Sequence, residues 1–259
     1  WAQNYGTPNY AAHGGFCSVN MAAAGIYTMG GAFWEFGQPD WDHTKLFMIF
    51  GVAEDHDSNP IKMGIGKLKA RGAKIIGVNP IRSGYNAVAD DWVGITPGTD
   101  GLFILALVHE LLKAGKIDLT YLAQYTNAPV LIDPETGLLM RDEQGKELVI
   151  DRATGSLTAF DQKGVKPDLN GSHGSAHTVF HTMIQRYLDP SYAPEAVADR
   201  AGISAGKIRA IANEIARVAF DEAIELDQPW TDFRGETHAK MTGRPVSFHA
   251  MRGISAHSN

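Results

Sequence analysis

The chain has 259 residues, of which 44% are hydrophobic and 20% charged, and its formal net charge is −6. This composition excludes a disordered or fibrous protein and indicates a globular protein with a sizeable core, in one large domain or two smaller ones. The negative charge argues against a nucleic-acid partner, which would require a basic face. The longest apolar run, residues 101–112, contains a His and a Glu and is too short to span a bilayer.

The first 43 residues are rich in Gly, Ala and aromatic residues, and a short helix is predicted from residue 17 to residue 29. Cys17, the only cysteine, would open this helix. A single cysteine excludes an internal disulfide and therefore gives no argument for an oxidising compartment. A helix N-terminus favours the thiolate, which binds metals and attacks electrophiles, but a buried hydrophobic role is the more frequent one. Burial, nucleophile and metal ligand all stay open.

Residues 45–115 predict alternating strands and helices. Three apolar runs have the length of strands buried on both faces, at 46–52, 73–78 and 91–95. Helices are predicted at 60–71, after an Asn-Pro start, and at 99–112, where Thr99 or Asp100 would cap the first turn. This order predicts an α/β fold in which helices cover a parallel sheet.

The second half of the chain changes character. Turn-rich segments at 133–137, 142–145 and 152–155 separate short strands at 138–141, 147–151 and 156–160, which predicts an inserted meander of β-hairpins. Helices follow at 177–188, 193–201 and 204–220, and Ser204 would cap the last of them. Residues 245–259 favour no single element.

Polar or conformationally special residues follow each predicted strand. Gly51, Asp57 and Asn59 lie between the first strand and its helix, where free backbone N–H groups and the positive helix end suit a phosphate. The GxGxxG fingerprint of nicotinamide-binding folds is absent, and a plain connecting loop is the alternative. Asn79 and Arg82 follow the second strand, where Arg82 could pair with a phosphate or simply point into solvent.

The third such position is the Pro97–Gly98 turn and Asp100 before the next helix. Asp100 could cap that helix, the commoner role, or accept two N–H bonds from a guanine base. Because successive strand ends of an open parallel sheet share one edge, the three loops together indicate a ligand site better than each does alone.

The ten histidines raise the possibility of a separate metal site. Two of them, His177 and His181, are four residues apart on one predicted helix, a spacing used by zinc pairs, but no HExxH pattern surrounds them. A structural or surface role is therefore the preferred interpretation. The other histidines considered as ligands are His56, His173, His249 and His257.

In this order, the segments resemble the molybdopterin oxidoreductases of the dimethyl-sulfoxide-reductase superfamily. The most specific stretch is Gly-Val-Asn-Pro-Ile-Arg at 77–82, followed by Ala-Asp at 89–90 and Thr-Pro-Gly-Thr-Asp at 96–100. Residues 192–219 also look like the family's helix pair. Ile81 separates the proline from Arg82, unlike the family pattern, which weakens the role of Arg82.

The resemblance implies roles for individual residues. The segment Gly-Thr-Pro-Asn at 6–9, with His13 and Cys17 after it, is similar to that of the polysulfide, thiosulfate and arsenate reductase branch, in which the cysteine thiolate ligates the metal. It implies that Cys17 is the metal ligand and that His13 faces the substrate. The residues it adds to the loop residues above are Asn9 and, in a segment that looks like one near the pterin, Arg252 with a catalytic role, His257 and Asn259.

The resemblance also implies a bis-molybdopterin-guanine-dinucleotide cofactor with molybdenum or tungsten, and a [4Fe-4S] cluster in an N-terminal part that this sequence lacks. It divides the chain into an active-site segment (1–43), an α/β dinucleotide-binding region (44–127), a β-hairpin insertion (128–175) and a helical region that returns to the cofactor domain (176–259). The chain starts at Trp1 rather than Met, so we expect an internal piece of a larger catalytic chain, inactive alone.

The implied reaction is a two-electron, oxygen-atom transfer on a small sulfur species or oxyanion, with sulfite the first choice and polysulfide or thiosulfate next. The implied partners are a quinone-linked membrane anchor and an iron–sulfur electron-transfer subunit. The compartment stays open, with the cytoplasmic face of a bacterial membrane complex preferred over the periplasmic face. The alternatives are a non-catalytic subunit that keeps this fold for assembly or electron transfer, and a nicotinamide dehydrogenase domain, against which the missing glycine fingerprint counts.

Overall fold

A computed structural model describes residues 2–9, 22–28, 39–51 and 60–250, and the chain forms two compact units, Trp1–Pro39 and Asp40–Asn259. The first unit contains the short helix α1 (Ala2–Tyr5) and a helical stretch at residues 22–28. The latter falls within the helix predicted at 17–29, of which residues 17–21 and 29 lie outside the described part of the chain.

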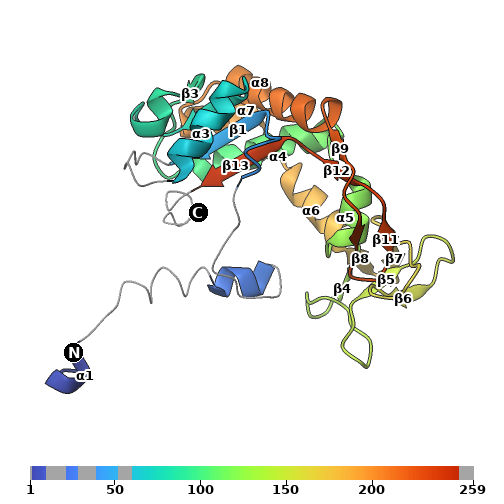
Figure 1. Ribbon diagram of the computed structural model, residues 1–259. Helices are drawn as coiled ribbons and strands as arrows, with labels where there is room; N and C mark the ends of the chain where they lie inside the picture. Colours follow the sequence, from blue (N-terminus) through green and yellow to red (C-terminus); the bar gives the residue numbers. More distant parts are fainter. Residues whose placement is uncertain (1, 10–21, 29–38, 52–59, 251–259) are drawn as a thin grey trace. The chain divides into compact units, whose positions relative to one another are not determined.

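The second unit is built on a four-stranded parallel sheet (Figure 1). Its strand order is β13-β1-β2-β3, and the strands are β13 (Val246–Ala250), β1 (Leu46–Phe50), β2 (Lys74–Val78) and β3 (Asp91–Val93). Every residue of β1 is buried, as expected for a strand covered on both faces. The predicted parallel sheet is therefore confirmed.

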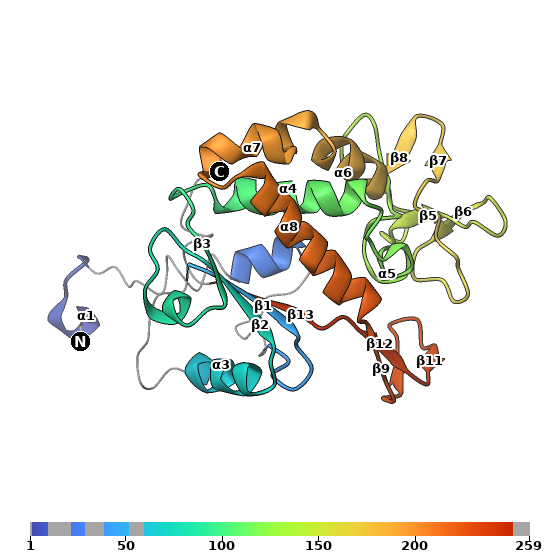
Figure 2. The same ribbon diagram turned by 90° about the horizontal axis from the view of Figure 1, so that it is seen from above.

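Helices cover both faces of this sheet (Figure 2). Leu46, Met48 and Phe50 point to the face that packs against α4 (Asp100–Lys113), α7 (Pro194–Ala201) and α8 (Ala205–Ala216). Phe47 and Ile49 alternate to the other face, beneath α3 (Pro60–Ala70) and η1 (Gly84–Ala87). The two apolar stripes of β1 thus hold the two helical layers.

The fourth strand, β13, was not predicted. It pairs with β1 in parallel, with Ile49 opposite His249. Residues 51–59 and 251–259 therefore follow adjacent strands that end at the same edge of the sheet. The strand order changes direction here, because β2 and β3 lie on one side of β1 and β13 on the other, and such a switch point is where open α/β sheets bind ligands.

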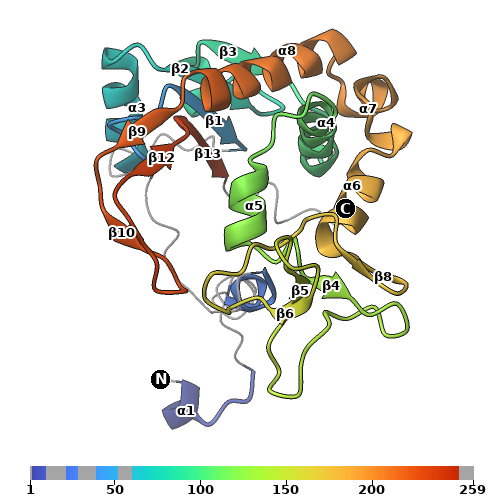
Figure 3. The same ribbon diagram turned by 90° about the vertical axis from the view of Figure 1, so that its right-hand side faces the viewer.

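Between α4 and α7 the chain forms the predicted hairpin insertion (Figure 3). After α5 (Leu119–Tyr125) come the short strands β4 (Leu131–Ile132), β5 (Leu148–Ile150), β6 (Leu157–Ala159), β7 (Ser172–His173) and β8 (Ala176–Thr178). Residues 138–141, predicted as a strand, form only isolated bridges. Helix α6 (Val179–Tyr187) begins two residues later than predicted, because 176–178 pair in β8 and the Thr178 hydroxyl accepts the N–H of His181 to cap the helix.

Two further hairpins precede β13. Strand β9 (Ile224–Leu226) pairs with β12 (Met241–Gly243), and β10 (Trp230–Thr231) with β11 (Thr237–His238). The predicted helix at 204–220 is α8, capped by Ser204, and continues as a π-helical turn, η3 (Arg217–Asp221). A short 3-10 turn, η2 (Pro190–Tyr192), joins α6 to α7. None of the described helices is both long and apolar enough to cross a bilayer.

Candidate cofactor site at the carboxyl edge of the sheet

The residues that follow β1 and β2 are joined to the neighbouring strands by backbone hydrogen bonds. The amide of Gly51 donates to the carbonyl of Val78 over 2.9 Å, and the amide of Asn79 donates to that of Val93 over 3.1 Å. Because paired strands run about 4.8 Å apart, the first residues beyond β1, β2 and β3 are near neighbours. Two of the predicted ligand-binding loops thus start side by side, and the third follows β3.

Two glycines at this edge have conformations that other residues rarely adopt. Gly51 has φ 66° directly after β1, and Gly98 has φ 82° in the turn before α4. A side chain at either position would strain the backbone. Pro97, beside Gly98, is exposed. These glycines let the chain turn sharply at the strand ends.

Asn79 is buried, with 5% of its surface exposed, and it shapes the loop after β2. Its side-chain oxygen accepts the amide of Ile81 over 3.3 Å, and its carbonyl accepts the indole N–H of Trp92 over 2.9 Å. Its side-chain NH₂ group makes no hydrogen bond to the described residues. Arg82 is exposed and forms no ion pair with any described residue.

Asp100 is the first residue of α4 and only 7% exposed. Thr99 occupies the N-cap position, and no side chain caps this helix end, so the predicted capping bond of Thr99 or Asp100 does not form. The Thr99 hydroxyl instead donates to the carbonyl of Thr96 over 2.7 Å. Within the described part of the chain, nothing donates a hydrogen bond to the Asp100 carboxylate. A carboxylate on a mostly buried residue, with no donor among the described residues, fits a ligand that supplies N–H groups.

A second polar atom without a partner lies near the end of β13. The Nε2 atom of His249 is buried and has no hydrogen-bond partner among the described residues. Burial lowers the pKa of His249, so its ring is neutral at pH 7. This half-buried imidazole is one of the histidines considered from the sequence as a metal ligand.

A close packing contact that the sequence did not indicate supports the loop after β2. Gly77 lies within β2, and a Cβ atom there would overlap the side-chain oxygen of Asn86 and come within 3.3 Å of its Cα. Asn86 is fully buried in η1. Because Gly77 has no side chain, the buried Asn86 side chain fits behind the end of β2. A glycine within a buried strand can indicate such a close approach.

The remaining candidate residues belong to the first unit or lie outside the described residues. Asn9 belongs to the first unit, where its amide donates to the Thr7 hydroxyl over 3.1 Å. Seven others lie outside the described residues: His13, Cys17, Asp57, Asn59, Arg252, His257 and Asn259. By connectivity alone, Arg252 is the second residue after β13.

Known proteins place this arrangement in a family. No protein-family model matches the chain. It is 47% identical to a sulfite dehydrogenase subunit of Allochromatium vinosum, over 100% of this chain and 28% of that protein. It is 27% identical to the thiosulfate reductase molybdopterin-containing subunit of Salmonella typhimurium, over 49% of this chain and 16% of that protein. The chain thus spans under a third of the length of these relatives.

A solved structure gives the same answer for the fold. Acetylene hydratase from Pelobacter acetylenicus superposes with a TM-score of 0.54 over 96% of this chain and 23% of that one, at 16% identity. The arsenate respiratory reductase molybdopterin-containing subunit of a Shewanella species is 23% identical over 96% of this chain. The chain belongs to the molybdopterin oxidoreductases and is homologous to one stretch of their catalytic subunits.

Proposed function

We propose that this chain forms part of the catalytic subunit of a sulfite-oxidising molybdopterin enzyme and holds one guanine dinucleotide at the carboxyl edge of its sheet. The family implies a molybdopterin cofactor with molybdenum or tungsten. Sulfite is chosen because the 47% identical relative is named a sulfite dehydrogenase. The observation that carries the binding site is that Asp100, a mostly buried residue, accepts no hydrogen bond at its carboxylate from the described residues.

Asp100 would recognise the guanine base. An ionised carboxylate offers two oxygens at the spacing of the ring N–H and the exocyclic NH₂ group of guanine, and such charge-assisted pairs are strong. Because Asp100 is the first residue of α4, a base bound to it would also lie at the positive end of the helix dipole. The neighbouring Pro97–Gly98 turn would let the backbone approach the base closely.

The loops after β1 and β2 would bind the ribose and phosphates. Gly51 has a positive φ directly after β1, and Asp57 and Asn59 follow it in the sequence before α3. Within the described part of the chain, the Asn79 NH₂ group donates no hydrogen bond and Arg82 forms no ion pair, so both would be available to an oxyanion. Arg252, His257 and Asn259 follow β13 in the sequence, and β13 pairs with β1, so they would complete the site from the other side of the switch point.

The reaction itself would take place beside the first segment of the chain. Cys17 would ligate the metal through its thiolate, His13 would face the substrate, and Asn9 would bind the cofactor. Arg252 is proposed to have a catalytic role. Oxidation of sulfite to sulfate adds one oxygen atom from water and releases two electrons and two protons. When bound, the cofactor supplies this oxygen-atom and electron transfer. In the proposed electron path, electrons pass through a [4Fe-4S] cluster to an iron–sulfur subunit and from there to a quinone-linked membrane anchor.

Replacing Asp100 with Asn tests the nucleotide site. The amide presents one acceptor and one NH₂ donor to two guanine donors, so retention of the cofactor should fall roughly 10- to 100-fold. GMP released by acid from purified enzyme, per mole of protein, measures this directly. Asp199→Asn is the matched control, because Asp199 is exposed on α7. Equal GMP content in wild-type and Asp100→Asn enzyme would remove Asp100 from the site.

Cys17→Ala tests the metal ligand separately. We expect sulfite oxidation to be lost while GMP content and the far-ultraviolet circular dichroism spectrum stay at wild-type values, since Cys17 would touch the metal and not the nucleotide. Full activity of this variant with bound molybdenum would contradict the assignment. Wild-type protein that binds no molybdenum or tungsten would support the non-catalytic alternative.

A further inference from the structure

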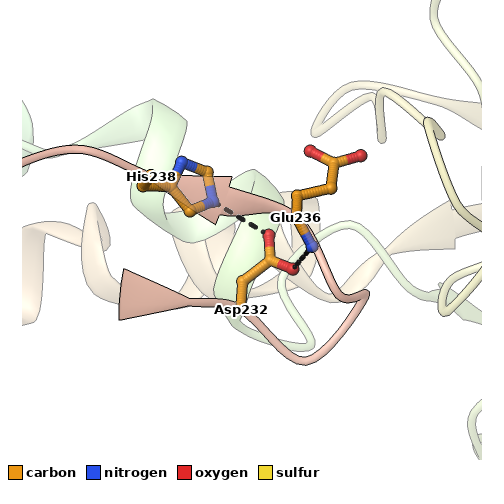
Figure 4. Close-up of side chains that lie close together, drawn as sticks. All are labelled: Asp232, Glu236 and His238. Atoms are coloured by element: carbon orange, nitrogen blue, oxygen red, sulfur yellow. Dashed lines mark hydrogen bonds and ion pairs between the residues drawn. The ribbon is translucent and has the colours of Figure 1, made fainter. Parts of the chain in front are cut away.

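The β10–β11 hairpin gathers three metal-ligating side chains that no sequence motif indicated. Asp232, Glu236 and His238 each offer one ligand atom, and these atoms lie within 4.8 Å of one another (Figure 4). The Asp232 Oδ2 atom is 3.2 Å from His238 Nε2. The hairpin turn at residues 232–236 brings the three together, since Asp232 and Glu236 flank the turn and His238 follows on β11.

The Asp232 side chain is buried, with only 3% of its surface exposed, and the backbone amides of Arg234 and Glu236 hold its carboxylate in place. The two amides bind Oδ1 over 2.9 Å each, which leaves Oδ2 to face His238.

Arg234, in the same turn, forms no ion pair with Asp232 or Glu236. It donates to the carbonyls of Phe160 and Gln124 instead, over 3.0 and 3.1 Å. Its guanidinium stacks on the Phe160 and Phe233 rings. In the described part of the chain, the Glu236 carboxylate has no hydrogen bond or ion pair, and Asp232 pairs only with His238.

The ligand atoms of the two carboxylates lie within 4.8 Å of each other. A cation between them would offset the repulsion between two like charges.

Aromatic packing holds the histidine ring in place. Trp230 stacks on His238 with ring centres 4.4 Å apart and an interplanar angle of 21°, and Tyr125 packs on Trp230 at 5.5 Å. The Trp230 indole N–H donates to the carbonyl of Lys240 over 3.1 Å, which fixes the stack. A ligand whose orientation is fixed before binding loses less freedom when a metal arrives.

We propose that Asp232, Glu236 and His238 bind a divalent transition-metal cation, Zn²⁺ in the first instance, at a site separate from the cofactor edge. One imidazole nitrogen and two carboxylate oxygens form a ligand set that Zn²⁺ accepts in tetrahedral sites, with a fourth position left to water. The cation would replace the direct contact between Asp232 Oδ2 and His238 Nε2. It would clamp the hairpin whose Arg234 reaches over to α5 and the insertion.

Glu236→Gln is the sharpest test. The Glu236 carboxylate makes no hydrogen bond or ion pair to the described residues, so its replacement should not lower the melting temperature of the metal-free protein. Calorimetric titration of EDTA-treated, purified protein with Zn²⁺ should show one micromolar site in the wild type and at least tenfold weaker binding in the variant. Zn²⁺ should raise the melting temperature of the wild type alone. Identical titrations of the two proteins would overturn the proposal.

His238→Ala should remove one equivalent of bound Zn²⁺, and His173→Ala, an exposed histidine on β7, is its matched control. Zinc bound with equal stoichiometry by wild type and His238→Ala, but lost in His173→Ala, would assign the binding to the surface histidines instead. The test does not depend on the cofactor, because both variants lie outside the residues assigned to it.

Discussion

The parallel sheet and the hairpin insertion belong to one compact unit but are stabilised by different means. The sheet and α4, α7 and α8 share a continuous apolar cluster that extends from Leu46 to Val218. The insertion has only small clusters, such as Val130, Val149 and Val165. Where little apolar surface is buried, hydrogen bonds must define the backbone instead.

Aspartate turns do this in the insertion. Four of its aspartates accept the amide of the residue two positions later over 2.8–3.2 Å: Asp133, Asp142, Asp151 and Asp168. Asp151 also accepts the amide of Lys166, 15 residues away, over 3.1 Å. Side-chain bonds of this kind replace the missing core with local turn geometry. We therefore expect the loss of apolar side chains to destabilise mainly the sheet region, and the loss of polar side chains to destabilise mainly the insertion.

The largest effect is expected for Phe103→Ala. Phe103 is fully buried between α4 and the sheet, so its loss should lower the free energy of unfolding by about 3–5 kcal/mol. Leu138→Ala, in the insertion and 69% exposed, should change it by less than about 0.5 kcal/mol. Urea unfolding measures both, and comparable losses would break the contrast between the two regions.

A smaller loss, about 1–3 kcal/mol, is expected for Gly77→Ala, because the new Cβ overlaps the buried Asn86 side chain. Gly66→Ala is its control in α3, where a Cβ meets nothing within 4 Å. In a helix this change should stabilise the protein by up to about 1 kcal/mol. If both substitutions change the free energy of unfolding in the same direction, the close packing of Asn86 against β2 does not explain why Gly77 is a glycine.

Arg234→Lys should act locally, by about 1–2 kcal/mol, since lysine lacks the planar fork that reaches two carbonyls and stacks on two rings. We expect faster proteolysis of the 227–240 hairpin with little change in the global urea midpoint. Arg200→Lys, exposed on α7, is the control. A loss of global stability equal to that of Gly77→Ala would instead join the hairpin to the main core.

The smallest effect is the acid response of the insertion. Backbone hydrogen bonds from Glu135 and Ala153 lower the pKa of Asp133 and Asp151 below the ordinary value of 3.8. A lowered pKa stabilises the fold above the unfolded value and ceases to do so as the pH falls through the folded one. The protection factors of residues 133–168 against hydrogen exchange should therefore fall below about pH 4. In Asp151→Asn, part of this loss of protection should already be seen at pH 7.

The sequence by itself determined the parts whose signal is local. Apolar runs located β1, β2, β3 and α4, and turn residues located the insertion. Both signals depend on residues that are adjacent in the sequence, so they can be recognised without the tertiary structure. For the candidate site, the same signals predicted that Gly51 and Asn79 follow neighbouring strands, as the backbone bonds to Val78 and Val93 confirm. The role of these residues stays a prediction.

Only the tertiary structure decided features whose partners are distant in the sequence. The register of β13 on β1 joins residues about 200 positions apart, as in the hydrogen bond between Thr44 and Ser247. The absence of a cap on α4 and the contact of Gly77 with Asn86 also depend on atoms that no local pattern specifies. In the β10–β11 hairpin, Asp232 and His238 meet because a turn folds one strand onto the other, while Arg234 of the same turn finds its hydrogen-bond partners on α5 and in the insertion.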